Sequence, residues 1–398
     1  MRAPTCLGIA AISAAIALAI GCGGTGSSKT NSPQGTAGNV QPISVSLGPN
    51  GNYANGLFTS VTICVPGSSN CQTISDVLVD TGSSGLRLLS SAVSIPLPQQ
   101  LAADGKPVAE CLPFLSGYTW GPVQTADVVL SSEKASSIAV QVLSDTALPV
   151  AAGCKDIGLP SQDTVQTLGA NGILGVGELD QDCPACSETG SANPGLYYEC
   201  GSSTCQATTE SLSAQVRNPV ASFPTDNNGV AIALPSVDGA SLSANGSLIF
   251  GIGTESNNGL GSAQVYTTDQ FGNFTTTYKG NSYPGSFIDS GSNGLFFLDS
   301  ASTGVPVCGD ASGFYCPAST QNLSAQNSGT NGTHGTVNFS IANADSLFSN
   351  SVDAAFADLG GPSAGVFDWG VPFFFGRTVF TAITGKSTPA GTGPYWAY

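Results

Sequence analysis

Two aspartates, each directly after an apolar run, are the residues of this chain whose surroundings favour chemistry. Asp80 follows such a run in VLVDTGSSGLRLL, and Asp289 follows one in SFIDSGSNGLFF. Burying an ionised carboxylate is costly without hydrogen-bond donors, so a chain that does so supplies partners or uses the acid for chemistry. Thr81, Gly82 and Ser83 are suitable partners for Asp80.

The two aspartate segments resemble each other. Without gaps, DTGSSGL and DSGSNGL agree at five of seven positions. Matching segments far apart in a chain indicate two copies of one structural unit, each contributing one acid. A single Asp-Thr-Gly is also a common turn at a strand end, but two copies with matched flanks favour a pair of functional acids.

Other catalytic chemistries have little support in the sequence. His334 is the only histidine and lies in the polar stretch NSGTNGTHGTVN, which argues against a Ser-His-Asp triad or a histidine metal site. The many glycines do not form a phosphate-binding loop followed by Lys. We therefore expect neither a metal nor a cofactor.

The composition, with only 9% charged residues, 51 Gly and many Ser, Thr and Asn, indicates an exported, β-rich protein. The chain has 398 residues, with 10 Lys and Arg against 26 Asp and Glu, and a net charge of −16. This charge makes nucleic acid or an anionic membrane surface an unsuitable partner. The length fits two or three average domains or one large two-lobed domain.

Strand patterns position both acids. Residues 57–80 form an expected hairpin around the turn PGSSN, so Asp80 leaves a strand end. Residues 114–130 and 137–145 are further expected strands, and the segment 183–224 is the candidate connection between the halves. Each half ends in a glycine-broken apolar run, and either Gly370 or Gly376 corresponds to Gly175.

The N-terminus has the pattern of an export signal. One early Arg precedes the apolar residues 7–20, which are fewer than the roughly 20 residues that span a bilayer. LAIGC resembles a bacterial lipobox and predicts lipidation of Cys22, with plain secretion as the alternative. We expect a signal peptide at residues 1–22 and a flexible tether at 23–40.

The cysteines fit an oxidising compartment. Without Cys6 and Cys22, ten of the 12 cysteines remain, an even number that five disulfides would use. The expected pairs are Cys64 with Cys71, Cys308 with Cys316 and Cys111 with Cys154. The cluster CPAC…CGSSTC forms disulfides under this interpretation, with a four-thiolate zinc site as the alternative.

These motifs resemble the pepsin-like aspartic peptidases. LVDTGSSGL, NGILGVG, GSLIFGIG and FIDSGSNGL occur in the order of that family, over nearly the whole chain after the tether. The resemblance implies an all-β fold with few short helices, in which two β-barrel lobes flank an active-site cleft. We expect the lobes to be residues 41–215 and 216–398. FDWGVPFFFGR and the lipoprotein start are similar to an uncharacterised bacterial branch of the superfamily.

The resemblance also implies the roles of the site residues. It places Asp80 and Asp289 side by side, where they share a proton and activate water for peptide hydrolysis. Thr81 and Ser290 would link the two loops, and Ser83 and Ser292 would donate to the outer carboxylate oxygens. The supporting residues of the two loops are Thr81, Gly82, Ser83, Ser290, Gly291 and Ser292.

The expected flap departs from the family pattern. The family pairs a flap Tyr, directly before a Gly, with a Trp after the first Asp motif, and here Arg87 stands at that Trp position. Gly117 or Gly121 as the flap glycine puts Ser116 or Trp120 at the Tyr position. The expected substrate-binding residues are Phe114, Tyr118, Trp120 and Arg87, with a cation–π contact from Arg87 as one possibility.

Two functions fit this sequence. The first is a monomeric aspartic endopeptidase of the cell envelope, acting on a peptide or protein and attached to a bacterial membrane only through lipid at Cys22. The second is a catalytically silent pepsin fold used as a binding or inhibitor module. Both acids and both neighbouring serines are retained, which favours the enzyme.

Overall fold

The computed structural model describes residues 38–144, 146–309 and 313–398. The predicted signal peptide, Cys22 and residues 23–37 of the predicted tether lie outside these ranges. Within them, no helix is long and apolar enough to cross a membrane.

Strands dominate both halves. Those of the first half are β1 (Val40–Ser46), β2 (Gly56–Cys64), β3 (Cys71–Asp80), β4 (Ser84–Leu89), β5 (Val108–Pro113), β6 (Tyr118–Leu130), β7 (Glu133–Leu143), β8 (Gly172–Val176), β9 (Tyr197–Cys200) and β10 (Cys205–Ala207). Those of the second half are β11 (Gly229–Ala233), β12 (Ala240–Ser241), β13 (Ala244–Phe250), β14 (Val265–Thr267), β15 (Phe274–Tyr278), β16 (Asn281–Ile288), β17 (Leu295–Leu298), β18 (Gln321–Ser328), β19 (His334–Ile341), β20 (Ala355–Phe356), β21 (Gly360–Gly361), β22 (Ser363–Trp369), β23 (Thr378–Ala382), β24 (Ser387–Thr388), β25 (Gly391–Thr392) and β26 (Tyr395–Ala397).

The helices are short. The α-helices are α1 (Ala152–Lys155), α2 (Val165–Leu168), α3 (Ser300–Thr303), α4 (Ala344–Leu347) and α5 (Val371–Phe374). The 3₁₀ turns are η1 (Ser90–Ala92), η2 (Pro184–Ser187), η3 (Gly190–Ala192) and η4 (Val220–Ser222).

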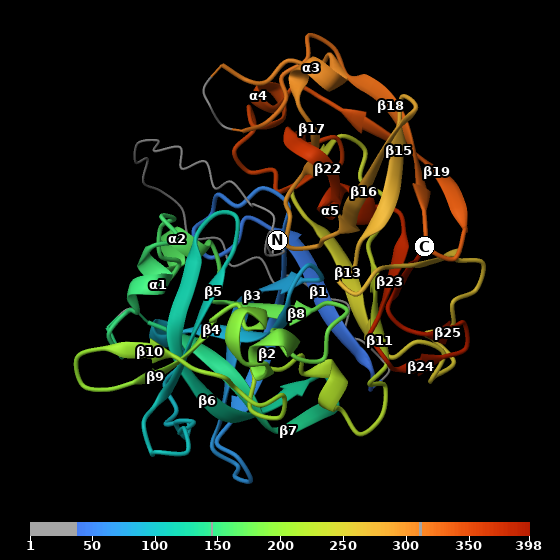
Figure 1. Ribbon diagram of the computed structural model, residues 1–398. Coiled ribbons are helices and arrows are strands. Elements are labelled where there is room, and N and C mark those ends of the chain that lie inside the picture. Colours follow the sequence, from blue (N-terminus) through green and yellow to red (C-terminus); the bar gives the residue numbers. More distant parts are fainter. Residues whose placement is uncertain (1–37, 145, 310–312) are drawn as a thin grey trace, which may run out of the picture.

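The strands build two barrel-like lobes that share a sheet. Strand β1 pairs with β2 on one side and with β13 on the other, which joins the halves, and a separate sheet runs from β19 to β21 in the second half. In Figure 1 the teal and green strands gather at the lower left and the orange strands at the upper right. The predicted all-β, two-lobed architecture is confirmed.

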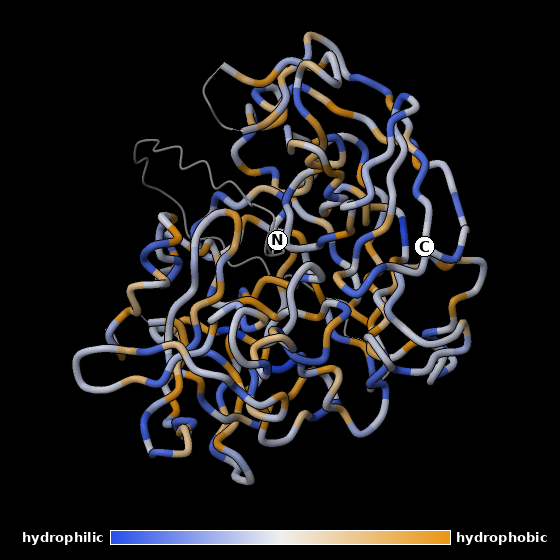
Figure 2. The backbone as a smooth tube through the Cα atoms, in the orientation of Figure 1, coloured by the Kyte–Doolittle hydropathy of each residue, from blue (hydrophilic) through white to orange (hydrophobic). Residues whose placement is uncertain are grey.

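Apolar residues of the interior strands form the core. Figure 2 shows orange apolar segments in the interior strands and blue segments on many outer loops. The predicted hairpin is formed by β2 and β3, with Cys64 opposite Cys71, and Asp80 is the last residue of β3 as expected. The segment 183–224 is not only a connection, because its strands β9 and β10 extend the first half's sheet beside β5.

Strand register resolves which glycine repeats Gly175. Asp80 lies opposite Gly175 in the parallel pair of β3 and β8. In the parallel pair of β16 and β22, Ile288, the residue before Asp289, lies opposite Trp369. The residue after Trp369 is Gly370, so Gly370 and not Gly376 corresponds to Gly175.

Five disulfides link cysteines of the described residues. The three predicted pairs are confirmed, and the CPAC…CGSSTC cluster forms two local disulfides, not a zinc site. The bonds are Cys64–Cys71, Cys111–Cys154, Cys183–Cys186, Cys200–Cys205 and Cys308–Cys316.

Candidate active site

Two loops, one from each half, meet through reciprocal hydrogen bonds. The backbone N–H of Thr81 donates to Ser290 Oγ at 3.1 Å, and the backbone N–H of Ser290 donates to Thr81 Oγ1 at 2.9 Å. The Ser290 hydroxyl in turn donates to the Val79 carbonyl at 2.8 Å. Because all these groups are buried, the loops hold each other in register without a contribution from solvent.

The meeting of the loops brings the two aspartates together. The backbone N–H of Gly82 donates to Asp80 Oδ1 at 2.7 Å and lies 3.2 Å from Asp289 Oδ1. Gly291 gives Asp289 Oδ1 the equivalent bond at 2.7 Å. The two residues are 6% and 7% exposed, so both acids are buried with only a small area open to solvent.

Serine hydroxyls contact the other oxygen of each acid. Ser83 Oγ donates to Asp80 Oδ2 at 2.5 Å, and Ser292 Oγ lies 2.9 Å from Asp289 Oδ2. The structure thus brings together both predicted acids and all six predicted supporting residues. The site has an approximate twofold symmetry that follows from the repeated sequence motif.

Burial and the neighbouring acid oppose ionisation of the pair. Burial raises the pKa of Asp289 well above its usual range, and the negative charge of Asp80 and a hydrogen bond with that carboxyl add to the rise. None of the ion pairs among the described residues includes either acid. The pair therefore retains a proton where isolated aspartates have lost theirs.

The two loop glycines leave room for the opposing carboxyl. A Cβ on Gly82 would lie 2.6 Å from Asp289 Cγ, and a Cβ on Gly291 would lie 2.8 Å from Asp80 Cγ. For any reaction that the acid pair catalyses, we expect Gly291→Ala to lower kcat/KM at least about 100-fold, because the acids must move apart. Gly259→Ala is the control, since its added Cβ meets no atom within 4 Å. Full activity of folded Gly291→Ala would contradict the need for this close approach.

Comparisons with known proteins agree with the fold and leave the chemistry open. A family described as a protein of unknown function, DUF3443, matches residues 35–398. The chain belongs to this family. The DUF3443 chain is also similar to the crystal structure of aspartic proteinase from Irpex lacteus, with a TM-score of 0.55 and 16% sequence identity over 90% of this chain and 96% of that one. No curated protein matches it. At this identity the likeness shows the fold alone, and it confirms the predicted pepsin-like fold.

The hairpin predicted to be the flap is formed by β5 and β6. The backbone N–H of Phe114 donates to the Gly117 carbonyl at 2.7 Å and closes the turn between the strands. Of the two candidate glycines, Gly117 lies in this turn, directly after Ser116, and Gly121 lies within β6. The Ser116 hydroxyl accepts a hydrogen bond from Gln162 at 2.6 Å.

The predicted flap aromatics divide between the tip and the core. Phe114 is half-buried at the turn and packs against an apolar cluster that includes Phe58. Tyr118 begins β6 and is buried. Trp120 is fully buried, with its ring 5.4 Å from that of Tyr198, so it belongs to the core of the hairpin.

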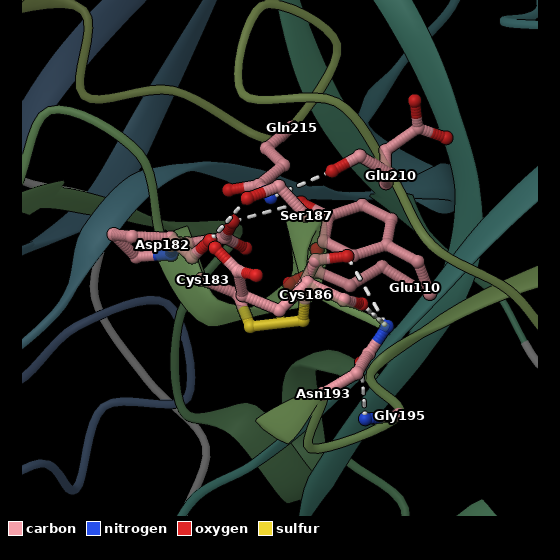
Figure 3. The surroundings of a disulfide bond; sticks show 12 residues. Glu110, Asp182, Cys183, Cys186, Ser187, Asn193, Gly195, Glu210 and Gln215 are labelled. Carbon is pink, nitrogen blue, oxygen red and sulfur yellow. Dashed lines mark hydrogen bonds between the residues drawn. A yellow bond between two sulfur atoms is a disulfide. The ribbon is translucent and has the colours of Figure 1, made fainter. Parts of the chain in front are cut away.

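Arg87 of the DUF3443 chain is a buried ion-pair residue. Its Nη2 lies 2.9 Å from Glu110 Oε1 and 2.7 Å from Asp182 Oδ2, and its side chain is 0% exposed. Figure 3 shows Glu110 and Asp182 beside the disulfide of Cys183 and Cys186. Because its guanidinium contacts these two acids, Arg87 supports the β5–β6 hairpin through Glu110 of β5.

Two residues near the acids were missed by sequence reasoning. Burial raises the pKa of the Tyr53 hydroxyl, and the charges of Asp80 and Asp289 raise it further, which places Tyr53 within their electrostatic reach. Asp368 is buried and shares Ser292 with Asp289. Its signal was available, because an acid inside the apolar run VFDWG has the same pattern that identified Asp80.

Proposed function

We propose that this DUF3443 protein is an aspartic-type endopeptidase that hydrolyses peptide bonds by activating water between Asp80 and Asp289. The observation that supports it most is the pair of buried acids, each held by a glycine amide and a serine hydroxyl from its own loop. A binding surface has no need for two acids in this costly arrangement.

The chemistry follows from one proton shared by two carboxyls. The ionised carboxyl removes a proton from water while the water oxygen attacks the scissile carbonyl carbon, and the protonated carboxyl donates to the carbonyl oxygen. The tetrahedral intermediate then collapses as its C–N bond breaks. The leaving nitrogen takes a proton from one carboxyl, and the other recovers a proton from the intermediate.

The proposed substrate is an extended peptide with an apolar side chain beside the cleaved bond. Phe114 at the flap turn packs against the same apolar cluster as Tyr53, which lies within electrostatic reach of the acids. An apolar side chain would gain burial against these two rings. Tyr118 follows the turn and is a further proposed contact.

We also propose an exported monomer, anchored to a bacterial membrane by lipid at Cys22. The five disulfides support an oxidising compartment. Metabolic labelling with a radioactive fatty acid tests the anchor, because a Cys22→Ser variant should lose the label. Gel filtration of a chain starting after Cys22 tests the monomer.

The alternative is a silent pepsin fold that binds a peptide without cleaving it. Ser116 at the flap Tyr position and the buried Arg87 at the Trp position favour it, because neither can form the family's flap contact.

Cleavage of a mixed peptide library from about pH 3 to 8, a range that spans the expected titration of the acid pair, separates the two functions. We expect cleavage with a maximum on the acid side and a preference for apolar side chains at the cut. A folded protein that binds library peptides and cleaves none at any pH would establish the binding module.

A further inference from the structure

A third buried carboxyl contacts the acid pair through one serine. Ser292 Oγ lies 2.9 Å from Asp289 Oδ2 and 2.6 Å from Asp368 Oδ2. Asp368 is 2% exposed, and its Oδ1 has no hydrogen-bond partner among the described residues. The three carboxyls of Asp80, Asp289 and Asp368 therefore lie in one buried group.

This arrangement breaks the symmetry of the site. Register places Phe296 opposite Asp368 in the pair of β17 and β22, and Arg87 opposite Ile173 in the equivalent pair of β4 and β8. The first half thus has Ile173 at the position that Asp368 occupies in the second. The Ser83 hydroxyl contacts one carboxyl, whereas the Ser292 hydroxyl contacts two.

The hydroxyl of Ser292 cannot satisfy two ionised carboxylates. It carries one proton and donates it to one acceptor, so its oxygen would face the second carboxylate with a lone pair and no proton between them. Such a contact at 2.6 Å requires a proton on the second carboxyl. One of the two acids therefore donates to Ser292.

The surroundings identify Asp368 as the donor. The strands packed against it offer only apolar residues at the paired positions, Phe287 from β16 and Phe296 from β17. The charged groups that act on it are Asp289 and Asp80, both acids, and no cation in the described part of the chain compensates them. Burial, and after it the charge of Asp289, raises the pKa of Asp368 well above its usual range.

We propose that Asp368 is a positioning residue that keeps its proton and donates it to Ser292, which directs the Ser292 proton onto Asp289. The chain of donors runs from Asp368 through Ser292 to Asp289 Oδ2. It holds the second acid in place without adding a negative charge to the pair. This inference rests on the proposed peptidase function for its kinetic consequence, but not for the protonation state itself.

Two substitutions of Asp368 distinguish its effect as a hydrogen-bond donor from the effect of a negative charge. Asp368→Asn keeps the shape and a neutral N–H donor, so we expect kcat/KM within about threefold of the parent and an unmoved acid limb of the pH profile. Asp368→Leu removes the donor, so we expect kcat to fall at least about tenfold, with a smaller change in KM, because Asp289 loses its orientation.

Two kinetic results would overturn the inference. If Asp368 were ionised in the working enzyme, Asp368→Asn would remove a negative charge and shift the acid limb to lower pH by about one unit or more. If the residue only filled space, the Asn and Leu variants would lose activity equally. Circular dichroism confirms that each variant is folded, and the Asn variant keeps the test valid if the Leu variant is not.

Infrared spectroscopy tests the proton without any substrate. The difference spectrum between parent and Asp368→Asn near neutral pH should contain the C=O stretch of a protonated carboxyl. A carboxylate band in its place would reject the protonated state. If the parent cleaves no peptide, the proposed function fails, while this spectrum still decides the state of Asp368.

Discussion

Asp80→Asn and Asp289→Asn should each lower kcat/KM for peptide cleavage at least about 1,000-fold, because the two acids act as a unit. An amide in place of either carboxyl can neither accept the proton of the attacking water nor alternate between acid and base. The structure predicts little change in fold, since Asn can still accept the Gly82 or Gly291 amide bond. Initial rates on the best library peptide and far-ultraviolet circular dichroism are the measurements.

The exposed Asp156→Asn variant is the control for loss of one negative charge and should keep parental activity. The double variant Asp80→Asn with Asp289→Asn should lose no more activity than the worse single variant, because the first substitution already disables the unit. Parental activity in either folded single variant would exclude the two-carboxylate mechanism and with it the proposed function.

The sequence predicted the centre of the site because each aspartate motif contains hydrogen-bond donors to its own acid. Each acid accepts hydrogen bonds from a glycine and a serine within three residues of it, so the local sequence defines most of the hydrogen bonds. The bonds between the loops were expected only from the resemblance, because Thr81 and Ser290 are distant in sequence. The local disulfides, such as Cys64 with Cys71, followed from short spacing across an expected hairpin.

The remaining features depend on contacts between residues that are far apart in the sequence. Arg87 contacts acids from β5 and from the segment after β8, and neither acid has a spacing that indicates the pairing. Asp368 reaches Ser292 only because β22 runs parallel to β16. The hairpin of β9 and β10 beside β5 could be recognised only from the fold, because these short strands lack apolar periodicity.

Arg87→Met should lower the free energy of unfolding by about 3–5 kcal/mol, because it leaves two buried acids without their cation. Glu110 and Asp182 are both buried, and the guanidinium is the positive group between them. Burial, with Glu110 nearby, already raises the pKa of Asp182 well above its usual range, against the opposing effect of Arg87. Urea unfolding with the disulfides intact is the measurement.

The direction in which the stability loss of Arg87→Met changes with pH distinguishes unpaired buried acids from simple loss of packing. A raised folded-state pKa means that the folded chain holds a proton that the unfolded chain releases. The stability that this proton contributes is complete below about pH 4, the pKa of Asp in the unfolded chain. It is lost as the pH rises through the folded-state pKa. Arg87→Met raises that folded pKa further, because it removes the group that lowers it. We therefore expect its stability loss to be larger at pH 8 than at pH 5.

Arg217→Met is the matched control, because its pair with Asp180 is 29% and 23% exposed and should contribute no more than about 1 kcal/mol. Adding Glu110→Gln and Asp182→Asn to Arg87→Met should recover part of the loss, since neutral amides are less costly to bury than unpaired carboxylates. An equal loss in Arg87→Met and Arg217→Met, or a loss independent of pH, would mean that the buried charges do not determine the stability of this region. If the expected pattern holds, Arg87 has a structural role, in which it neutralises two buried acids beside the β5–β6 hairpin.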